Sequence, residues 1–148
     1  MASEWELITA GLAAYLTDAL RAAYTADCFA EDVTSGAHDW QTLDPGFTPA
    51  IAIWQLERTQ PDPDVPSYLR SVRLVALIRR KAASAAVMQT DGNELERNLD
   101  TWFRDPLVLG GSQVSIFHGS GQTSTVDAGD NECLLDYYVT VKYRQSLY

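Results

Sequence analysis

The stretch Cys133–Gln145 reads CLLDYYVTVKYRQ, and its pattern decides the fold. Every second residue is apolar or aromatic and most of those between are polar; the apolar set is Cys133, Leu135, Tyr137, Val139, Val141 and Tyr143. Because successive side chains of a strand point to opposite faces of a sheet, this alternation predicts a strand with one buried face and one polar face. Such a strand needs neighbouring strands and a covering layer, which other parts of the chain must supply.

The residues before this strand predict one neighbour. QVSIFHG at residues 113–119 is a short strand, and SGQTSTVDAGDNE at residues 120–132 is long, polar and glycine-bearing. We interpret the polar stretch as a wide hairpin loop, so that the final strand pairs back on residues 113–119.

Two further strands are predicted upstream. AIAIWQLER at residues 50–58 has a strand-like apolar core, and the next nine residues hold three prolines and must form a loop. SYLRSVRLVALIRRK at residues 67–81 fits both strand alternation and helical spacing, but its β-branched residues favour a strand. Within residues 25–49 we expect short extended pieces at 28–33 and 39–43 and a turn at DPGF.

Two helices complete the pattern. Residues 4–23 follow a capping-box sequence and carry apolar residues at helical spacing. Residues 82–93 are a connector of unclear shape, and from Thr90 or Asp91 within this stretch a second helix is predicted to begin. It is predicted to end at Asp105-Pro106. Its apolar stripe is Leu95, Leu99, Trp102 and Phe103.

The predicted fold class is therefore α+β, with a mixed or antiparallel sheet of about four strands packed against two main helices. The length of 148 residues suits a single domain covering residues 1–148, and 46% hydrophobic against 21% charged residues indicates a globular chain rather than a disordered one. The first residues lack the basic region of a signal peptide, and no apolar run is long enough for a membrane helix. We expect folding in a cytosol, without a membrane partner.

The net charge of −9 is unevenly distributed along the chain. Residues 1–66 hold eleven acids and two bases, whereas residues 67–148 hold nine of each. Nucleic-acid binding depends on Lys and Arg neutralising phosphates, so this balance predicts a protein that does not grip DNA.

Residues that suggest chemistry are few. His38 beside Asp39, and His118 at the end of a predicted strand, lack a recognisable nucleophile motif. DAGDNE at residues 127–132 resembles a loose calcium loop but does not follow the EF-hand pattern. Cys28 and Cys133 are far apart in sequence and are interpreted as small hydrophobic residues. We therefore expect no catalytic residues, no metal and no cofactor.

Surface cations and aromatic residues offer candidates for a protein interface instead. The basic cluster in residues 70–81 is split between two faces in strand geometry, and pairing with the acidic first half, within or between subunits, is its simplest use. Trp and Tyr are enriched among interface hot spots, and Arg pairs well with carboxylates. The candidate residues are Trp40, Tyr68, Arg70, Arg73, Arg79, Arg80, Lys142 and Arg144.

The arrangement resembles the tail terminator proteins of tailed bacteriophages and related tail-like particles. The likeness covers about residues 4–146 and lies in the order of elements: an N-terminal helix, a strand introduced by proline in TPAIAIWQLE, the Arg-flanked strand LRSVRLVALIRRK, the helix in ELERNLDTWFRDPLVLGG and the final strand ending in YYVTVKYRQ.

The resemblance implies a structural virion protein that forms a ring, usually of six subunits, on the head-proximal end of the tail tube. Its implied partners are other copies of itself, the major tail tube protein and a neck or head-completion protein, and DNA passes through its lumen. The family brings no catalytic residues to this chain. Two other readings stay open: another neck or tail-completion protein, and a small α+β enzyme or ligand-binding domain.

Overall fold

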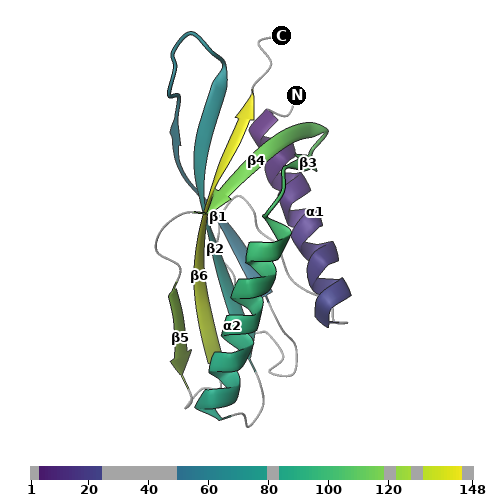
Figure 1. Cartoon of the computed structure of the whole chain (residues 1–148), viewed down its shortest axis with the longest axis vertical. Helices are drawn as coiled ribbons and strands as arrows, with labels where there is room; N and C mark the ends of the chain where they lie inside the picture. The colour runs from purple at the N-terminus through teal and green to yellow at the C-terminus, as the bar shows by residue number, and fades with distance from the viewer. Residues whose placement is uncertain (1–3, 25–49, 80–83, 119–122, 128–131, 145–148) are drawn as a thin grey trace.

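The computed structural model describes residues 4–24, 50–79, 84–118, 123–127 and 132–144. Two helices, α1 (Glu4–Tyr24) and α2 (Ala85–Trp102), accompany six strands. The strands are β1 (Ala50–Thr59), β2 (Ser67–Arg79), β3 (Leu107–Leu109), β4 (Ser112–His118), β5 (Thr123–Asp127) and β6 (Glu132–Arg144) (Figure 1). The α+β class is confirmed, and the sheet has six strands rather than about four.

The sheet runs in the order β1-β2-β6-β4-β3, with β5 also paired to β6. Every strand pair is antiparallel. One edge of β6 pairs with β2 over the full length of both strands, and the other edge is shared between β4 and β5. The strand with which the sequence analysis began is therefore the central strand of the sheet.

Alternation in the two longest strands is confirmed by burial. All six residues of the alternating apolar set in β6, from Cys133 to Tyr143, are buried. In β2 the buried set includes Val72, Leu74, Ala76 and Ile78, so the strand reading of residues 67–79 is right and the helical one is wrong. The proline-rich segment forms the loop between β1 and β2, as predicted.

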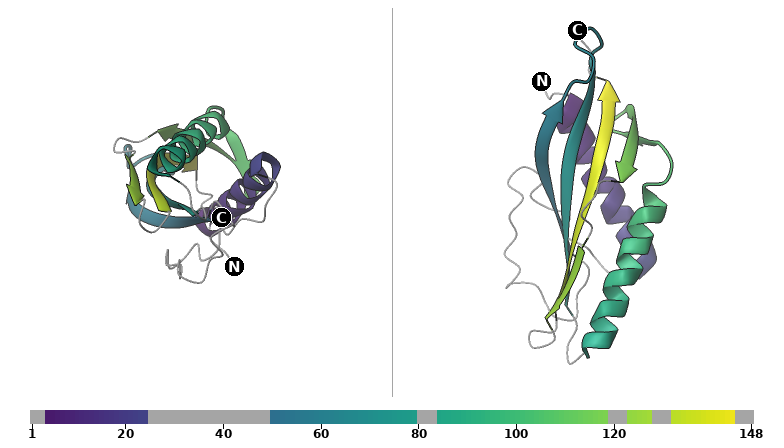
Figure 2. Two further views of the ribbon diagram at one scale, coloured as in Figure 1. Left: turned by 90° about the horizontal axis from the view of Figure 1, so that it is seen from below. Right: turned by 60° about the vertical axis from the view of Figure 1, so that its left-hand side comes forward.

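Both helices pack on the same face of the sheet, as the right-hand view of Figure 2 shows. The core between the layers includes Ile8, Leu12, Leu16 and Leu20 of α1 and Met88, Leu95 and Leu99 of α2. We call the other face, which points away from both helices, the outer sheet face. No helix of the described segments is long and apolar enough to cross a membrane.

Helix α1 matches its predicted span closely and is tied to both of its neighbours. The Ser112 hydroxyl of β4 donates a 2.7 Å hydrogen bond to the Glu4 carboxylate. The Tyr15 hydroxyl donates a 2.8 Å hydrogen bond to the carbonyl of Trp102 at the end of α2. These bonds join the two helices and the sheet into one body.

The predicted start of the second helix is wrong. Helix α2 begins at Ala85, within the segment expected to be a connector, and Ser84 caps it by accepting the Val87 N–H at 3.3 Å. Gly92 lies buried inside the helix beside Met88, Leu95 and Leu99. Gly disfavours helices in isolation, but packing against the sheet outweighs that local preference.

Two short strands were also missed. Residues 107–109 form β3, which turns back into β4 through Gly110 and Gly111, both with positive φ (57° and 82°). Residues 123–127, expected to lie in a wide loop, form β5 and pair with β6. The expected pieces at residues 28–33 and 39–43 and the DPGF turn lie outside the described residues.

Candidate subunit interface

The predicted interface residues do not form one surface. Arg70 points toward the helices: its guanidinium carbon lies 4.8 Å from the centre of the Trp5 ring, and Nη1 donates to the Leu56 carbonyl at 3.4 Å. A cation over an indole ring is an attractive arrangement within the chain. Arg70 therefore stabilises the packing of α1 on the sheet and is not a free surface cation.

Tyr68 was expected to be an exposed anchor, but it is half-buried against the core. Its ring stacks on Tyr143 with centroids 5.7 Å apart, and the Arg58 guanidinium lies 4.5 Å from its centre. Tyr143 in turn lies 5.2 Å from Trp5. The alternation of β2 explains why Tyr68 is half-buried, because Tyr68 lies on the same face of the strand as buried Val72.

Arg73 lies on the outer sheet face, opposite to Arg70, as strand geometry predicts. Its Nε and Nη2 donate to Oδ1 of Asp136 at 2.9 Å and 2.7 Å. Arg73 thus pairs with a carboxylate of the charge-balanced second half of the chain, and not with the acidic first half as expected.

The structure does not describe the side chains of three other predicted interface residues. Arg79 is the last residue of β2, with only its backbone described, and Arg80 and Trp40 lie outside the described residues. His38 and Cys28 also lie outside them.

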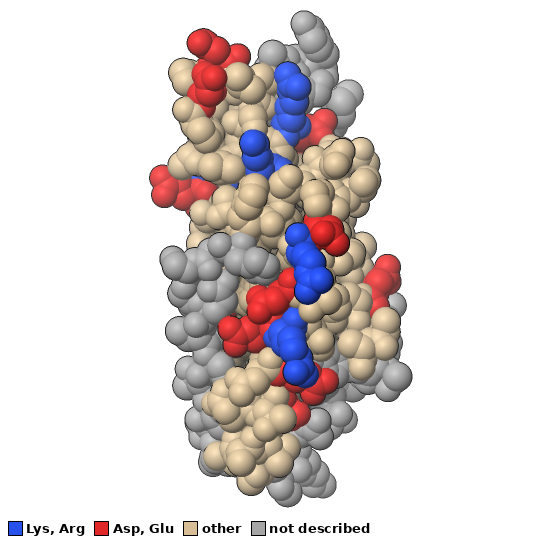
Figure 3. All heavy atoms as spheres, in the orientation of Figure 1, with Lys and Arg blue, Asp and Glu red and all other residues tan. Residues whose placement is uncertain are grey.

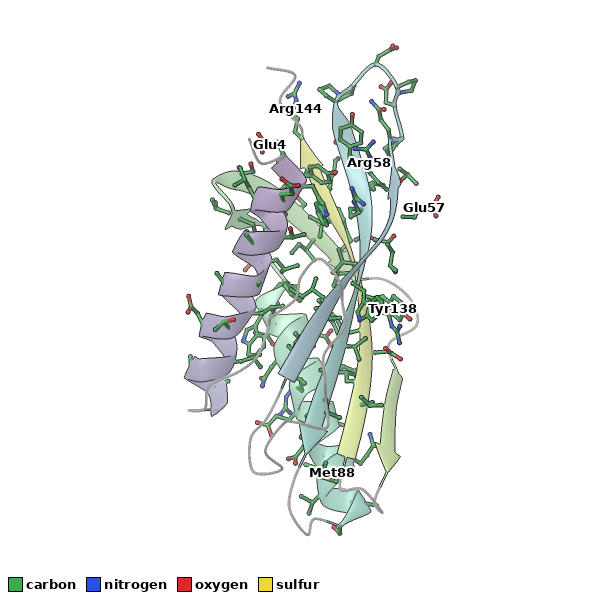
Figure 4. The ribbon with its side chains drawn as sticks, turned by 180° about the vertical axis from the view of Figure 1, so that it is seen from behind. Glu4, Glu57, Arg58, Met88, Tyr138 and Arg144 are labelled. Atoms are coloured by element: carbon green, nitrogen blue, oxygen red, sulfur yellow. The ribbon has the colours of Figure 1, made fainter. Side chains whose placement is uncertain are left out.

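Lys142 and Arg144 are the predicted candidates that remain available for a partner. Both side chains are exposed at the end of β6, and neither has an ion-pair partner in the described part of the chain. They border a hollow of about 360 Å³ whose lining includes Ser67, Gln113, Ser115, Lys142 and Arg144. Figure 4 shows Arg144 near the end of the molecule where the β1–β2 hairpin also projects.

The outer sheet face also carries exposed aromatic and apolar side chains that were not predicted as interface residues. Trp54 is 38% exposed and Phe117 is 53% exposed, while Leu56 and Leu134 are 40% exposed. The register places Trp54, Arg73 and Tyr138 in one row across β1, β2 and β6. Tyr138 projects from the side of β6 away from the helices (Figure 4). We call Trp54, Leu56, Phe117, Leu134 and Tyr138 the outer apolar set.

A signal for this set was present in the sequence. Trp54 and Phe117 stand one position out of phase with the buried residues Ile53 and Ile116, so alternation places them on the opposite face. Which strands lie side by side, and hence that these residues share one sheet face, required the topology.

No cluster suited to metal binding is present among the described residues, where no three His, Cys, Asp or Glu side chains converge. His118 is the last residue of β4, with only its backbone described, and most of the DAGDNE stretch lies outside the described residues. The Cys133 side chain is buried in the core.

Among the described residues, the Tyr137 hydroxyl has the most strongly shifted pKa, and it joins α2 to the sheet. The Tyr137 hydroxyl donates to Oδ1 of Asp100 at 2.5 Å. Burial of the phenol, together with this hydrogen bond and the negative charge of Asp100, raises the pKa of Tyr137 far above its ordinary value. Tyr137 is therefore a neutral donor that anchors the helix.

The charges on the face seen in Figure 3 do not gather into one basic patch. Lys and Arg side chains are spaced along this face, with Asp and Glu side chains beside them. Such a mixture suits contacts with other proteins better than a continuous track for DNA phosphates.

No protein-family model matches the chain, and a search of curated proteins gives no match either.

Proposed function

We propose that this chain is a structural protein of a tailed bacteriophage or a related tail-like particle. In this proposal several copies, six in the related family, form a ring on the head-proximal end of the tail tube. The ring ends tube polymerisation and offers the surface to which the head is joined. The chain acts in the virion tail after assembly in the host cytoplasm.

The observation that carries the proposal is the two-sided sheet. The inner face packs against α1 and α2, whereas the outer sheet face presents large apolar side chains such as Trp54 and Phe117 to solvent. Soluble monomers rarely expose contiguous apolar surface unless it meets a partner. Exposed aromatic residues are the usual anchors of protein interfaces.

The partners follow from the same arrangement. A closed ring needs two different patches on each subunit, since each copy contacts the next head to tail. The tube protein and the neck or head-completion protein are the further partners in this proposal. DNA would pass through the lumen without specific binding, and the net charge of −9 opposes tight phosphate contacts.

A deletion experiment in the producing phage tests the proposal. Without the gene we expect tails longer than wild type that fail to join heads, because nothing stops tube growth. Complementation with the wild-type gene should restore a single tail length in negative-stain electron micrographs.

The same micrographs distinguish a tail terminator from a neck or tail-completion protein. Tails of normal length that fail to join heads would identify a neck or tail-completion protein instead. A deletion that leaves both tail length and head joining unchanged would overturn both structural roles.

A further inference from the structure

The β1–β2 hairpin forms an acidic tip at one end of the molecule. Figure 1 shows the hairpin projecting beyond the remainder of the sheet near the C-terminus. The loop carries Asp62 and Asp64, and all of its side chains up to Val65 are exposed. We call residues 60–66 the hairpin tip.

The hairpin tip is held in shape by its own hydrogen bonds. The Asp64 N–H donates to the Asp62 carboxylate at 3.0 Å, and the Val65 N–H donates to the Asp62 carbonyl at 3.1 Å. The Gln60 side-chain amide donates to the Val65 carbonyl at 2.9 Å. A loop ordered in this way loses little conformational freedom when it meets a partner.

Unpaired positive charge lies at the same end of the molecule. Lys142 and Arg144 border the hollow described above, together with the hydroxyls of Ser67 and Ser115 and the amide of Gln113. We call these five residues the basic hollow. Ammonium, guanidinium, hydroxyl and amide groups together can donate hydrogen bonds to carboxylates.

The two charged surfaces do not neutralise each other within one chain. Val65 lines the hollow, so the hairpin tip lies beside it. Even so, in the described structure neither Asp62 nor Asp64 forms an ion pair with Lys142 or Arg144. These charges are therefore available to a second molecule.

We propose that the basic hollow of one copy receives the hairpin tip of a second copy of this chain. Two carboxylates then face two cations, and Val65, which is 38% exposed, adds apolar contact. The contact joins two different surfaces of identical chains. Where a copy gives its tip to one neighbour and receives the tip of another, the contact is head to tail and repeated rotation can close it into a ring. This inference rests on the proposed ring and names the contact that closes it.

Charge reversal with a complementary mixture tests this contact. The tip variant is Asp62→Lys/Asp64→Lys, and the hollow variant is Lys142→Glu/Arg144→Glu. Each alone sets like charges against each other, so we expect about tenfold or more weaker self-association in sedimentation and native mass spectrometry. Mixed one to one, the variants present opposite charges at every contact, and association should return.

Matched controls carry the same change of charge elsewhere. Asp18→Lys/Glu94→Lys alters two exposed acids on the helices, and Arg97→Glu/Arg104→Glu alters two exposed cations on or just after α2. Both controls should associate as the wild-type chain does. Circular dichroism and thermal unfolding of every variant separate loss of contact from loss of fold.

Carbodiimide cross-linking reads the contact directly, even when association is weak. In an equal mixture of ¹⁴N- and ¹⁵N-labelled wild-type chains, an amide between Lys142 and Asp62 or Asp64 should join peptides of different isotope. Cross-links found only within one isotope would overturn the proposal, as would wild-type chains that stay monomeric and give no such link.

The outcomes also distinguish this contact from the function. If the reversals leave association and tail length unchanged, the assignment of the contact fails while the ring function stands. If the chain does not control tail length in the particle, the function fails, although the mixed-isotope link can still report a contact between copies. Binding of duplex DNA by the wild-type protein, lost in the hollow variant, would assign the hollow to phosphate instead.

Discussion

At the scale of single residues, Gly11 and Gly110 set how closely α1 approaches the β3–β4 turn. A Cβ on Gly11 would lie 2.5 Å from the Gly110 nitrogen, and a Cβ on Gly110 would lie 2.3 Å from the Leu7 carbonyl oxygen. Both obstacles are backbone atoms, which cannot swing aside as a side chain can.

The substitution Gly11→Ala should therefore destabilise the fold, although alanine is the better helix former. We expect a net loss of about 1–3 kcal/mol, the usual range for overpacking, in urea unfolding. Ala10→Ser, on an exposed position of the same helix, serves as the control and should change stability by less than about 0.5 kcal/mol. A Gly11→Ala protein as stable as wild type would show that the helix and turn can separate freely.

The ionisation of a single residue, Tyr137, is expected to make the stability of the fold depend on pH in the alkaline range. Its pKa is raised in the folded state, mainly by burial, above the ordinary value of 10.0. Its contribution is thus fully present below pH 10 and is lost as the pH rises further, because the unfolded chain releases the proton first.

The substitution Tyr137→Phe removes this proton linkage. At pH 7 it should cost about 1–3 kcal/mol through loss of the hydrogen bond to Asp100. Above pH 10 the variant should lose stability less steeply than wild type, by up to about 1.4 kcal/mol per pH unit. Urea unfolding between pH 7 and 11 measures both, and parallel pH profiles for the two proteins would contradict this assignment.

At the scale of elements, Ser84 marks the start of α2. Its hydroxyl accepts the Val87 N–H in the first turn, so Ser84→Ala should cost about 1 kcal/mol. Ser84→Asp should restore most of that loss, since Asp is as good a cap. Thermal unfolding of the three proteins checks the ranking, and a Ser84→Ala protein as stable as wild type would place the start of the helix elsewhere.

The sequence predicts best the elements in which the pattern of apolar residues repeats over many positions. In β6, β2 and α1 the apolar residues repeat over many positions, and one face of each element is buried. The beginning of α2 was missed because Gly92 lowers local helix propensity, while the packing that outweighs it comes from distant strands. β3 and β5 were missed because three or five residues are too few to show a period, and each depends on its neighbour for its bonds.

The candidate interface was harder to predict for the same reason. Arg70 and Arg73 look alike in sequence, yet each is held within the chain, one by Trp5 and the other by Asp136. Lys142 and Arg144 form no ion pair with the described residues, and alternation places both on the outer sheet face. The positions of these cations in the sequence do not reveal which of them are paired, because strand register and helix packing decide the partners.

At the scale of the whole molecule, the outer apolar set should matter for assembly more than for stability. Phe117→Ser is expected to change the free energy of unfolding by less than about 1 kcal/mol, as for most exposed positions. The same change should impair tail-length control in the complementation assay. Val87→Ser, at an apolar residue of α2 that is 45% exposed and lies off the sheet, is the matched control and should complement fully. Equal behaviour of the two variants would remove the outer sheet face from the interface.

The overall charge predicts the response to DNA. With a net charge of −9, the purified protein should not shift duplex DNA at micromolar concentration and about 150 mM salt. An electrophoretic shift that weakens steeply with added salt would show that phosphate contacts had been underestimated.

The central place of β6 has a consequence for synthesis. β2, β4 and β5 all pair with β6, yet β6 leaves the ribosome after all three. Until then each of them has an open edge, and the aromatic stack on Tyr143 cannot form. Pairing between segments so distant in the chain is slow, and exposed edges invite premature association. Translation of β6 therefore times the folding of the domain, and a nascent chain can join other copies correctly only after this strand has emerged.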